Sequence, residues 1–180
     1  MDTKEEKTKA RAEAKRILES MTDERIRESD AKILKGIFEN YYFRNARSIF
    51  VYVSTDKEPD TLKLIDAALE DGKAVYVPKC EKKPYMKAVR INSRDELEPG
   101  FYGIPEPVSD EGFDGNIDIA IVPCLAASSD GRRLGHGGGY YDCFLNRRII
   151  YKICICRKEL INENLPTDAF DVMMDEVITD

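Results

Sequence analysis

The first forty residues have the apolar spacing of helices. Residues 3–20 are rich in Ala, Lys, Glu and Arg, and we expect a helix there. Thr22 is placed as the N-cap of a second helix that runs to about Phe38, with acidic residues in its first turn. The apolar residues of this second helix recur every three or four positions, which predicts one buried face: Ile26, Ile33, Leu34, Ile37 and Phe38.

From Ser48 onward, short apolar runs of β-branched and aromatic residues alternate with helical segments. Strands are predicted at 48–53, 74–78, 86–91, 117–122, 149–156 and 176–179. Helices are predicted at 61–71, with Gly72 as the C-cap, and at 140–147. Residues 99–107 are expected to be an irregular loop because they are rich in proline and glycine. The alternation predicts a Rossmann-like three-layer α/β fold, with helices on both faces of a mainly parallel sheet, after the N-terminal helical pair.

Length and charge narrow the class of protein. A chain of 180 residues, 42% of them hydrophobic, predicts one folded domain over residues 1–180. Lys and Arg number 28 and Asp and Glu 34, so the net charge of −6 argues against broad nucleic-acid binding. No apolar run has the length of a membrane span, and the charged N-terminus lacks a secretory signal, so a cytoplasmic protein is expected.

The five cysteines do not have the pattern of a disulfide framework or a zinc site. Their number is odd and their positions are scattered, which fits a reducing compartment. Cys154 and Cys156 alternate along a predicted strand and have no second close Cys or His pair, so we interpret them as buried, inert thiols.

A glycine-rich loop carries the strongest chemical signal. Five of the eleven glycines lie within residues 131–139, between an apolar strand and a predicted helix start at Tyr140. Ligands of α/β sheets bind beyond the carboxyl ends of strands, and backbone N–H groups of a glycine loop can surround an anion. The helix N-terminus adds positive partial charge, and Arg132 and Arg133 add full charges. Together these features predict a phosphate site.

For several other polar residues, spacing alone does not assign a role. The loop matches neither the Walker pattern nor GxGxxG. Asp142 could reach phosphate through Mg²⁺ or could simply favour the helix N-terminus, and the residues alone leave both open. For His136, the only histidine, a ligand contact is favoured over proton transfer. Lys7, Arg11 and Glu58 have the spacing of ordinary surface charges.

The run Arg133-Leu-Gly-His-Gly-Gly-Gly-Tyr-Tyr-Asp142, preceded by Asp118-Ile-Ala-Ile-Val-Pro123, resembles the signature of the 5-formyltetrahydrofolate cyclo-ligase family, also called methenyltetrahydrofolate synthetases. The resemblance covers essentially the whole chain. Its further matches are Lys7 with Arg11, Glu58 with Thr61, Gly103-Ile-Pro-Glu-Pro107 and Asp175-Glu-Val-Ile. The chain differs from the usual family pattern at Cys124–Ser128, Gly138 and Ala169–Asp171.

The resemblance implies a set of site residues, with ATP as co-substrate and Mg²⁺ as cofactor. The implied ATP-binding residues are Lys7, Arg11, Arg133, Leu134, Gly135, His136, Gly137, Gly138, Gly139, Tyr140 and Tyr141. The implied folate-binding residues are Val53, Glu58, His136, Gly137, Gly138, Gly139 and Tyr140. Arg133, His136 and Tyr140 are the implied catalytic residues, and Asp142 and Asp175 are the implied metal ligands.

The activity that follows from the resemblance is the ATP-dependent cyclisation of 5-formyltetrahydrofolate to 5,10-methenyltetrahydrofolate, with release of ADP and phosphate. Folate and ATP are the expected partners of a monomeric enzyme, with no nucleic acid and no membrane. Two alternatives remain: a related ATP-dependent enzyme that acts on another N-formyl or amide substrate, and a non-catalytic folate-binding protein.

Overall fold

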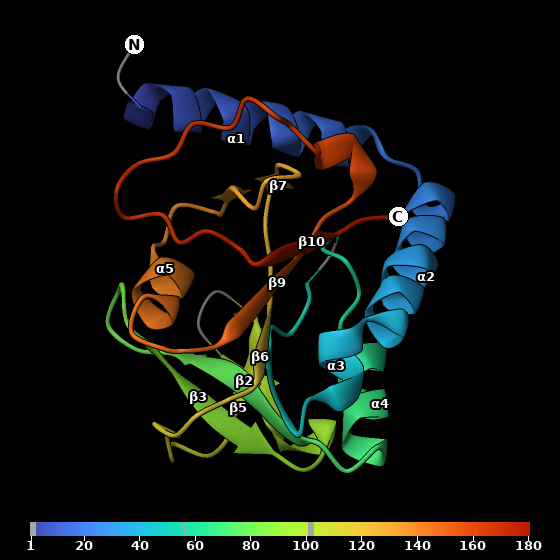
Figure 1. Cartoon of the computed structure of the whole chain (residues 1–180), viewed down its shortest axis with the longest axis vertical. Helices are drawn as coiled ribbons and strands as arrows, with labels where there is room; N and C mark the ends of the chain where they lie inside the picture. Colours follow the sequence, from blue (N-terminus) through green and yellow to red (C-terminus); the bar gives the residue numbers. More distant parts are fainter. Residues whose placement is uncertain (1–2, 56, 101–102) are drawn as a thin grey trace.

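A six-stranded, mostly parallel sheet forms the centre of the molecule (Figure 1). The computed structural model describes residues 3–55, 57–100 and 103–180. The strand order is β10-β9-β6-β1-β2-β3, and only the β2–β3 pair is antiparallel. The strands are β1 (Ser48–Val51), β2 (Ala74–Cys80), β3 (Met86–Ile91), β6 (Ile119–Val122), β9 (Tyr151–Ile155) and β10 (Glu176–Ile178). The predicted mainly parallel α/β sheet is confirmed.

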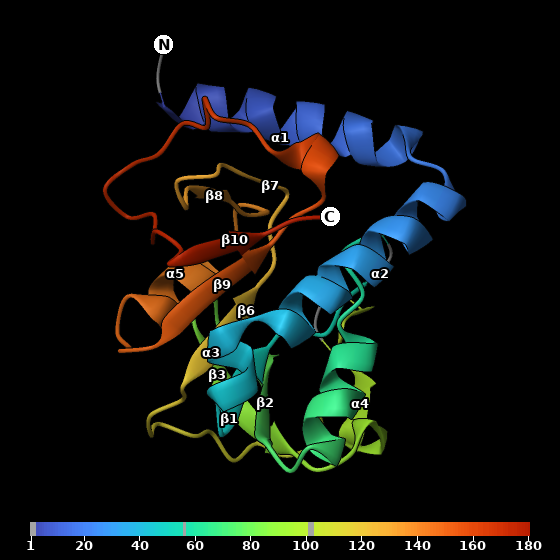
Figure 2. The ribbon, with the colours of Figure 1, turned by 45° about the vertical axis from the view of Figure 1, so that its right-hand side comes forward.

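Alternate residues of the central strands feed two separate cores, one on each face of the sheet. Ile119 and Ile121 of β6 lie in one core, whereas Ala120 and Val122 lie in the other. The first core is covered by α2 (Asp23–Glu39), α3 (Tyr41–Asn45) and α4 (Leu62–Glu70). The second contains residues of α1 (Thr3–Ser20) and α5 (Tyr140–Leu145). Figures 1 and 2 show α2, α3 and α4 on the side of the sheet away from α5.

Local signals in the sequence explain where the helices begin and end. The Thr22 side chain accepts a hydrogen bond of 3.2 Å from the Arg25 N–H, which caps α2. Gly72 follows α4 with φ of 76°, a left-handed conformation that glycine adopts without strain. The helices predicted at 3–20, at 22–38 and at 61–71 are therefore confirmed.

The buried thiols are also confirmed. Cys154 and Cys156 are almost completely buried in the core that α1 and α5 cover. The hydrogen bond with Cys124 and the burial of the sulfur raise the pKa of Cys154 well above its ordinary value. The Cys154 thiol therefore stays protonated at neutral pH.

Three features of the fold differ from the sequence-based prediction. Residues 99–107 were expected to be an irregular loop. In the structure, β4 (Leu97–Pro99) and β5 (Pro105–Pro107) pair antiparallel. That expectation was wrong because proline is tolerated in a short two-stranded ladder at positions that need no N–H; residues 101 and 102 lie outside the described residues. The short α3 and the hairpin of β7 (Ala126–Ala127) and β8 (Arg133–Leu134) were not predicted.

In the ranges that the structure describes, no helix is long and apolar enough to cross a membrane.

Candidate active site

The glycine-rich loop joins the β7–β8 hairpin to α5. β6 delivers the chain to Pro123, and the hairpin is closed by a 2.8 Å hydrogen bond from the Leu125 N–H to the Leu134 carbonyl. Leu134 itself is buried and anchors the start of the loop. Gly137 and Gly139 have φ of 90° and 75°, in the left-handed region that a side chain rarely adopts. The loop path therefore requires glycine at these two positions.

In the described part of the chain, the backbone donors of this loop are left without acceptors. Among the described residues, none accepts a hydrogen bond from the N–H groups of residues 135–139. These five N–H groups precede the first turn of α5, where the helix dipole also favours negative charge. The loop can therefore donate to the oxygens of an anion such as phosphate.

Arg133 lies beneath the loop as a buried cation. Its side chain is 3% exposed, and its Nη2 donates to both carboxylate oxygens of Asp142, at 3.0 and 2.9 Å. Its Nη1 donates to the Pro123 carbonyl at 3.1 Å, and the guanidinium lies 5.7 Å from the centre of the Tyr141 ring. The buried Nε has no acceptor among the described residues. A buried donor without a partner is costly, so the guanidinium depends on its contacts with Asp142 and Pro123.

Gly135 is needed for close packing against this cation. A Cβ at position 135 would lie 2.9 Å from Nη1 of Arg133. The Gly135 carbonyl also accepts a 2.9 Å hydrogen bond from Nε of Arg11, which comes from α1. The loop is thus held between a buried arginine on one side and a helix arginine on the other.

Lys7 lies one turn before Arg11 on α1 but contacts a different segment. Its Nζ lies 2.6 Å from a carboxylate oxygen of Asp168 and 2.5 Å from one of Asp171. Burial lowers the pKa of Lys7, but the hydrogen bonds with the two aspartates outweigh this effect and raise it above its ordinary value. Figure 1 shows the C-terminal segment that carries these aspartates running beside α1.

Glu58 is brought to the glycine loop from the other side. Its Oε1 lies 3.6 Å from Nε2 of His136, and its Oε2 accepts hydrogen bonds of 2.9 Å from the N–H and the hydroxyl of Thr55. Burial raises the pKa of Glu58, but the nearby His136 imidazole and the hydrogen bonds from Thr55 outweigh it, so the pKa lies below its ordinary value. Glu58 is therefore a carboxylate at neutral pH, aimed at the loop.

Comparisons with known proteins identify the family. The family model described as "5-formyltetrahydrofolate cyclo-ligase family" matches residues 3–180. The chain belongs to this family. The predicted resemblance, enzyme class and ligase activity are thereby confirmed.

Relatives of the cyclo-ligase family match over nearly their whole length. The chain is 32% identical to a 5-formyltetrahydrofolate cyclo-ligase from Mus musculus, over 93% of this chain and 90% of the relative. A solution structure of the 5,10-methenyltetrahydrofolate synthetase of Aquifex aeolicus superposes with a TM-score of 0.83 at 28% identity, covering 96% of this chain and 88% of that one. A Mycoplasma pneumoniae synthetase shares the fold, with a TM-score of 0.73 at 19% identity, covering 100% and 99% of the two chains.

The structure brings several of the predicted site residues together around the glycine loop and leaves Val53 apart from them. Contacts around the glycine loop bring together Arg11, Glu58, Arg133, His136 and Tyr141. The Val53 side chain, by contrast, is buried in the core that α2, α3 and α4 cover, so a folate could reach only its backbone. Sequence reasoning did not indicate Asp168 or Asp171, since nothing in their spacing relates them to Lys7.

The two predicted metal ligands differ in their surroundings. Asp142 faces Arg133 and accepts a 3.2 Å hydrogen bond from the Val172 N–H. Asp175 accepts 2.7 Å contacts from both the backbone N–H and the ammonium of Lys152. The described part of the chain contains no cluster of three His, Cys, Asp or Glu residues that could hold a metal. Because Mg²⁺ is often bound through one or two carboxylates and substrate phosphates, Asp142 fits such a site, while Asp175 is held by a lysine.

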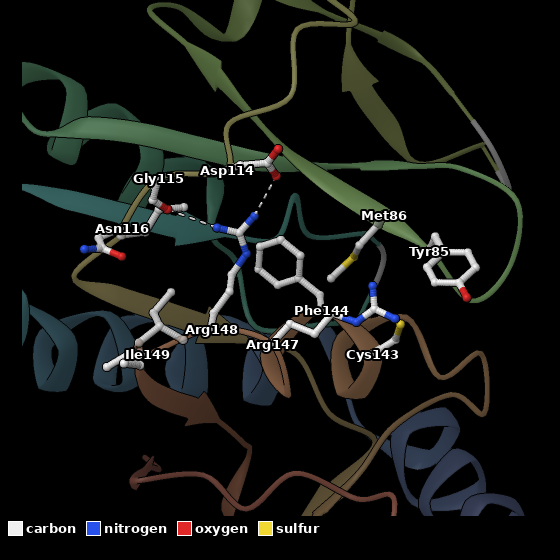
Figure 3. A pocket seen from close by; sticks show the side chains of 12 residues that line it. Tyr85, Met86, Asp114, Gly115, Asn116, Cys143, Phe144, Arg147, Arg148 and Ile149 are labelled. Atoms are coloured by element: carbon white, nitrogen blue, oxygen red, sulfur yellow. Dashed lines mark hydrogen bonds and ion pairs between the residues drawn. The ribbon is translucent and has the colours of Figure 1, made fainter.

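A separate pocket of about 420 Å³ lies at the other end of α5 (Figure 3). Tyr85, Cys143 and Arg147 line it, and Arg148 donates across it to the Gly115 carbonyl. None of the predicted site residues lines this pocket. The predicted site is therefore the glycine loop at the amino end of α5, and this pocket is distinct from it.

Proposed function

We propose that this chain cyclises 5-formyltetrahydrofolate to 5,10-methenyltetrahydrofolate at the glycine loop, using ATP and releasing ADP and phosphate. The observation that carries this assignment is the set of five loop N–H groups, at residues 135–139, that have no acceptor among the described residues and lie beside the buried guanidinium of Arg133. Family membership supplies the reaction, and these donors supply a place for the triphosphate of ATP.

The residues around the loop divide the binding between the two substrates. Residues 134–141 would hold the phosphates, with Arg11 and Arg133 neutralising their charge. Lys7 would join them once its aspartate partners give way to phosphate. Glu58, a carboxylate fixed by Thr55, would accept hydrogen bonds from the N–H groups of the pterin ring, beside His136 and Tyr140.

The chemistry requires positioning more than a protein nucleophile. The formyl oxygen attacks the γ-phosphorus of ATP, and ADP leaves. N10 of the folate then attacks the activated formyl carbon; N10 loses its proton, and phosphate departs as the ring closes. Phosphoryl transfer of this kind depends on alignment and charge neutralisation, which the loop amides and Arg133 provide. Mg²⁺, held by Asp142 and the phosphates, would supply further neutralisation when bound.

We further propose that residues 1–180 act as a single catalytic unit, as a cytoplasmic monomer without nucleic-acid partners. In support of this proposal, one chain carries every predicted site residue, and its net charge is −6.

The test is incubation of the purified chain with 5-formyltetrahydrofolate and Mg-ATP, with optical detection of the methenyl product. The expected result is product formation that requires ATP and yields one ADP per product. A parallel assay with simple N-formyl compounds addresses the alternative substrates. Folate binding without ATP consumption would instead establish a non-catalytic binding protein and overturn the proposal.

A further inference from the structure

Arg157 is the largest side chain that is completely buried in the described structure, and no part of the reaction scheme uses it. It follows β9 at the carboxyl edge of the sheet. Burying a guanidinium costs several kcal/mol, and well-packed apolar residues often serve as well or better in a purely structural position. The acceptors of its five N–H donors therefore indicate what this residue does.

The guanidinium of Arg157 donates mainly to the loop that carries Glu58. Its Nε and Nη2 donate to the Lys57 carbonyl at 3.2 and 3.1 Å, and Nη2 also donates to the Glu58 carbonyl at 3.0 Å. On the opposite side, Nη1 contacts α2 through the Ile26 carbonyl at 3.2 Å and a carboxylate oxygen of Asp30 at 2.8 Å. Arg157 thus connects the Glu58 loop to α2, a helix that packs in the core through Ile33 and Ile37.

The backbone of this loop needs such support. Lys57 has φ of 64°, a left-handed conformation that is strained for a residue with a side chain. The two carbonyls that Arg157 binds belong to this strained residue and to Glu58 itself. The loop is also closed by Thr61, whose hydroxyl donates to the Tyr52 carbonyl at 2.6 Å. These contacts fix where the Glu58 carboxylate points.

We propose that Arg157 is a positioning residue for substrate binding: by holding the carbonyls of Lys57 and Glu58, it aims the Glu58 carboxylate at the folate side of the glycine loop. The proposal rests on the proposed function for its kinetic consequence. It assigns to Arg157 an effect on folate binding, with no effect on ATP binding, because the ATP-binding side is held by Arg11 and Arg133.

The kinetic test compares Arg157→Lys with Arg25→Gln. Arg25 is a matched control, since it also joins α2 to the C-terminal part of the chain, through Glu159 and Asp180, but has no contact with the described residues of the Glu58 loop. Arg157→Lys should raise KM for 5-formyltetrahydrofolate about tenfold or more and leave KM for ATP within about twofold. Arg25→Gln should lower the melting temperature and leave both KM values unchanged. Equal changes in both KM values, or the same folate effect in Arg25→Gln, would overturn the proposal.

A double-mutant cycle shows whether Arg157 acts through Glu58. In a Glu58→Ala background, Arg157→Lys should add no further increase in KM for the folate, because the carboxylate that it aims is gone. An additive increase would contradict the proposal. Where Arg157→Lys does not fold, Asp30→Asn takes its place under the same criteria, since it weakens the Nη1 anchor and leaves the guanidinium in the chain.

Amide hydrogen exchange gives a measurement that does not depend on activity. The Thr55 N–H, which donates to Glu58, should exchange faster in Arg157→Lys and at the wild-type rate in Arg25→Gln. Unchanged exchange at Thr55 in Arg157→Lys would refute the positioning role. A wild-type chain that protects Thr55 in this way but makes no methenyl product would instead refute the proposed function.

Discussion

At the scale of single residues, the site depends on a buried cation, Arg133, and on the carboxylate that pairs with it. Asp142 accepts two hydrogen bonds from Arg133 but is itself 24% exposed, so it faces both the buried guanidinium and solvent. In the proposed reaction, the open side of the same carboxylate would face the metal ion. One side chain would join the fixed arginine to a ligand that arrives with ATP.

Asp142→Asn should affect both activity and stability. Loss of a charge next to the transferred phosphoryl group should reduce kcat about a hundredfold or more, equivalent to ~3 kcal/mol in the barrier. Because Arg133 then lies buried without a counter-charge, the free energy of unfolding should also fall by about 3 kcal/mol. Steady-state kinetics over a range of Mg²⁺ concentrations and urea unfolding measure the two effects.

The matched control is Asp66→Asn, which removes the partner of Arg94 in an exposed pair. In Asp66→Asn, kcat and the free energy of unfolding should both stay close to the wild-type values, since surface pairs contribute about 1 kcal/mol or less. Wild-type turnover in Asp142→Asn would remove the metal and phosphate role that we assign to Asp142.

At the scale of elements, the long, strongly patterned segments could be predicted and the short ones could not. The helices at α1, α2 and α4 and the central strands follow from periodicity, caps and β-branched runs. By contrast, α3 has five residues, and β4, β5, β7 and β8 have two or three each, too few for a pattern. Their pairing is decided by the surrounding tertiary structure. The glycine loop could be predicted because its signal is local in the sequence.

Gly135→Ala should disturb the glycine loop without unfolding the protein. The added methyl group would lie 2.9 Å from Nη1 of Arg133 and would displace the guanidinium from the Pro123 carbonyl. We expect KM for ATP to rise about tenfold or more, with a smaller change in KM for the folate. Nucleotide titration by calorimetry provides an independent affinity.

Gly72→Ala is the control for a glycine substitution as such. Position 72 has φ of 76° with open space around it, and it lies at the end of α4 away from the loop. The strain of an alanine in this left-handed conformation should lower the free energy of unfolding by about 1 kcal/mol. KM for ATP should stay unchanged. If the two variants changed KM for ATP equally, close packing of Gly135 on Arg133 would not explain the effect.

At the scale of the whole molecule, the site combines segments that only the fold brings together. Arg11, Glu58 and Arg133 come from α1, from the loop after β1 and from β8. Spacing in the sequence could not relate Glu58 to His136, which lies 78 positions away, and family resemblance was needed to select it. Arg157 had a weak signal, a charged residue at the end of an apolar strand, but only the three-dimensional contacts reveal that it holds the Glu58 loop.

Asp180, which follows β10, links α2 to the sheet and should make stability depend on pH. Burial raises the pKa of Asp180, but hydrogen bonds from Arg25, Lys158 and Ser29 outweigh it and lower the pKa to about 2. The carboxyl group of an unfolded chain titrates near pH 3.8. A lowered pKa means that the unfolded state takes up the proton first, so the ionised group stabilises the fold above about pH 4 and this contribution is lost as the pH falls toward 2.

From this shift, Asp180 should contribute on the order of 2 kcal/mol at neutral pH. Urea unfolding of the wild type and of Asp180→Asn between pH 6 and about pH 2 measures the contribution. The difference between their free energies of unfolding should be constant above about pH 5 and should shrink steadily below about pH 4. Glu13→Gln, which removes one partner of an exposed pair with Arg16, should show almost no difference at any pH. If the difference in free energy of unfolding between wild type and Asp180→Asn stayed the same down to about pH 2, the link between α2 and Asp180 would not depend on the charge of Asp180.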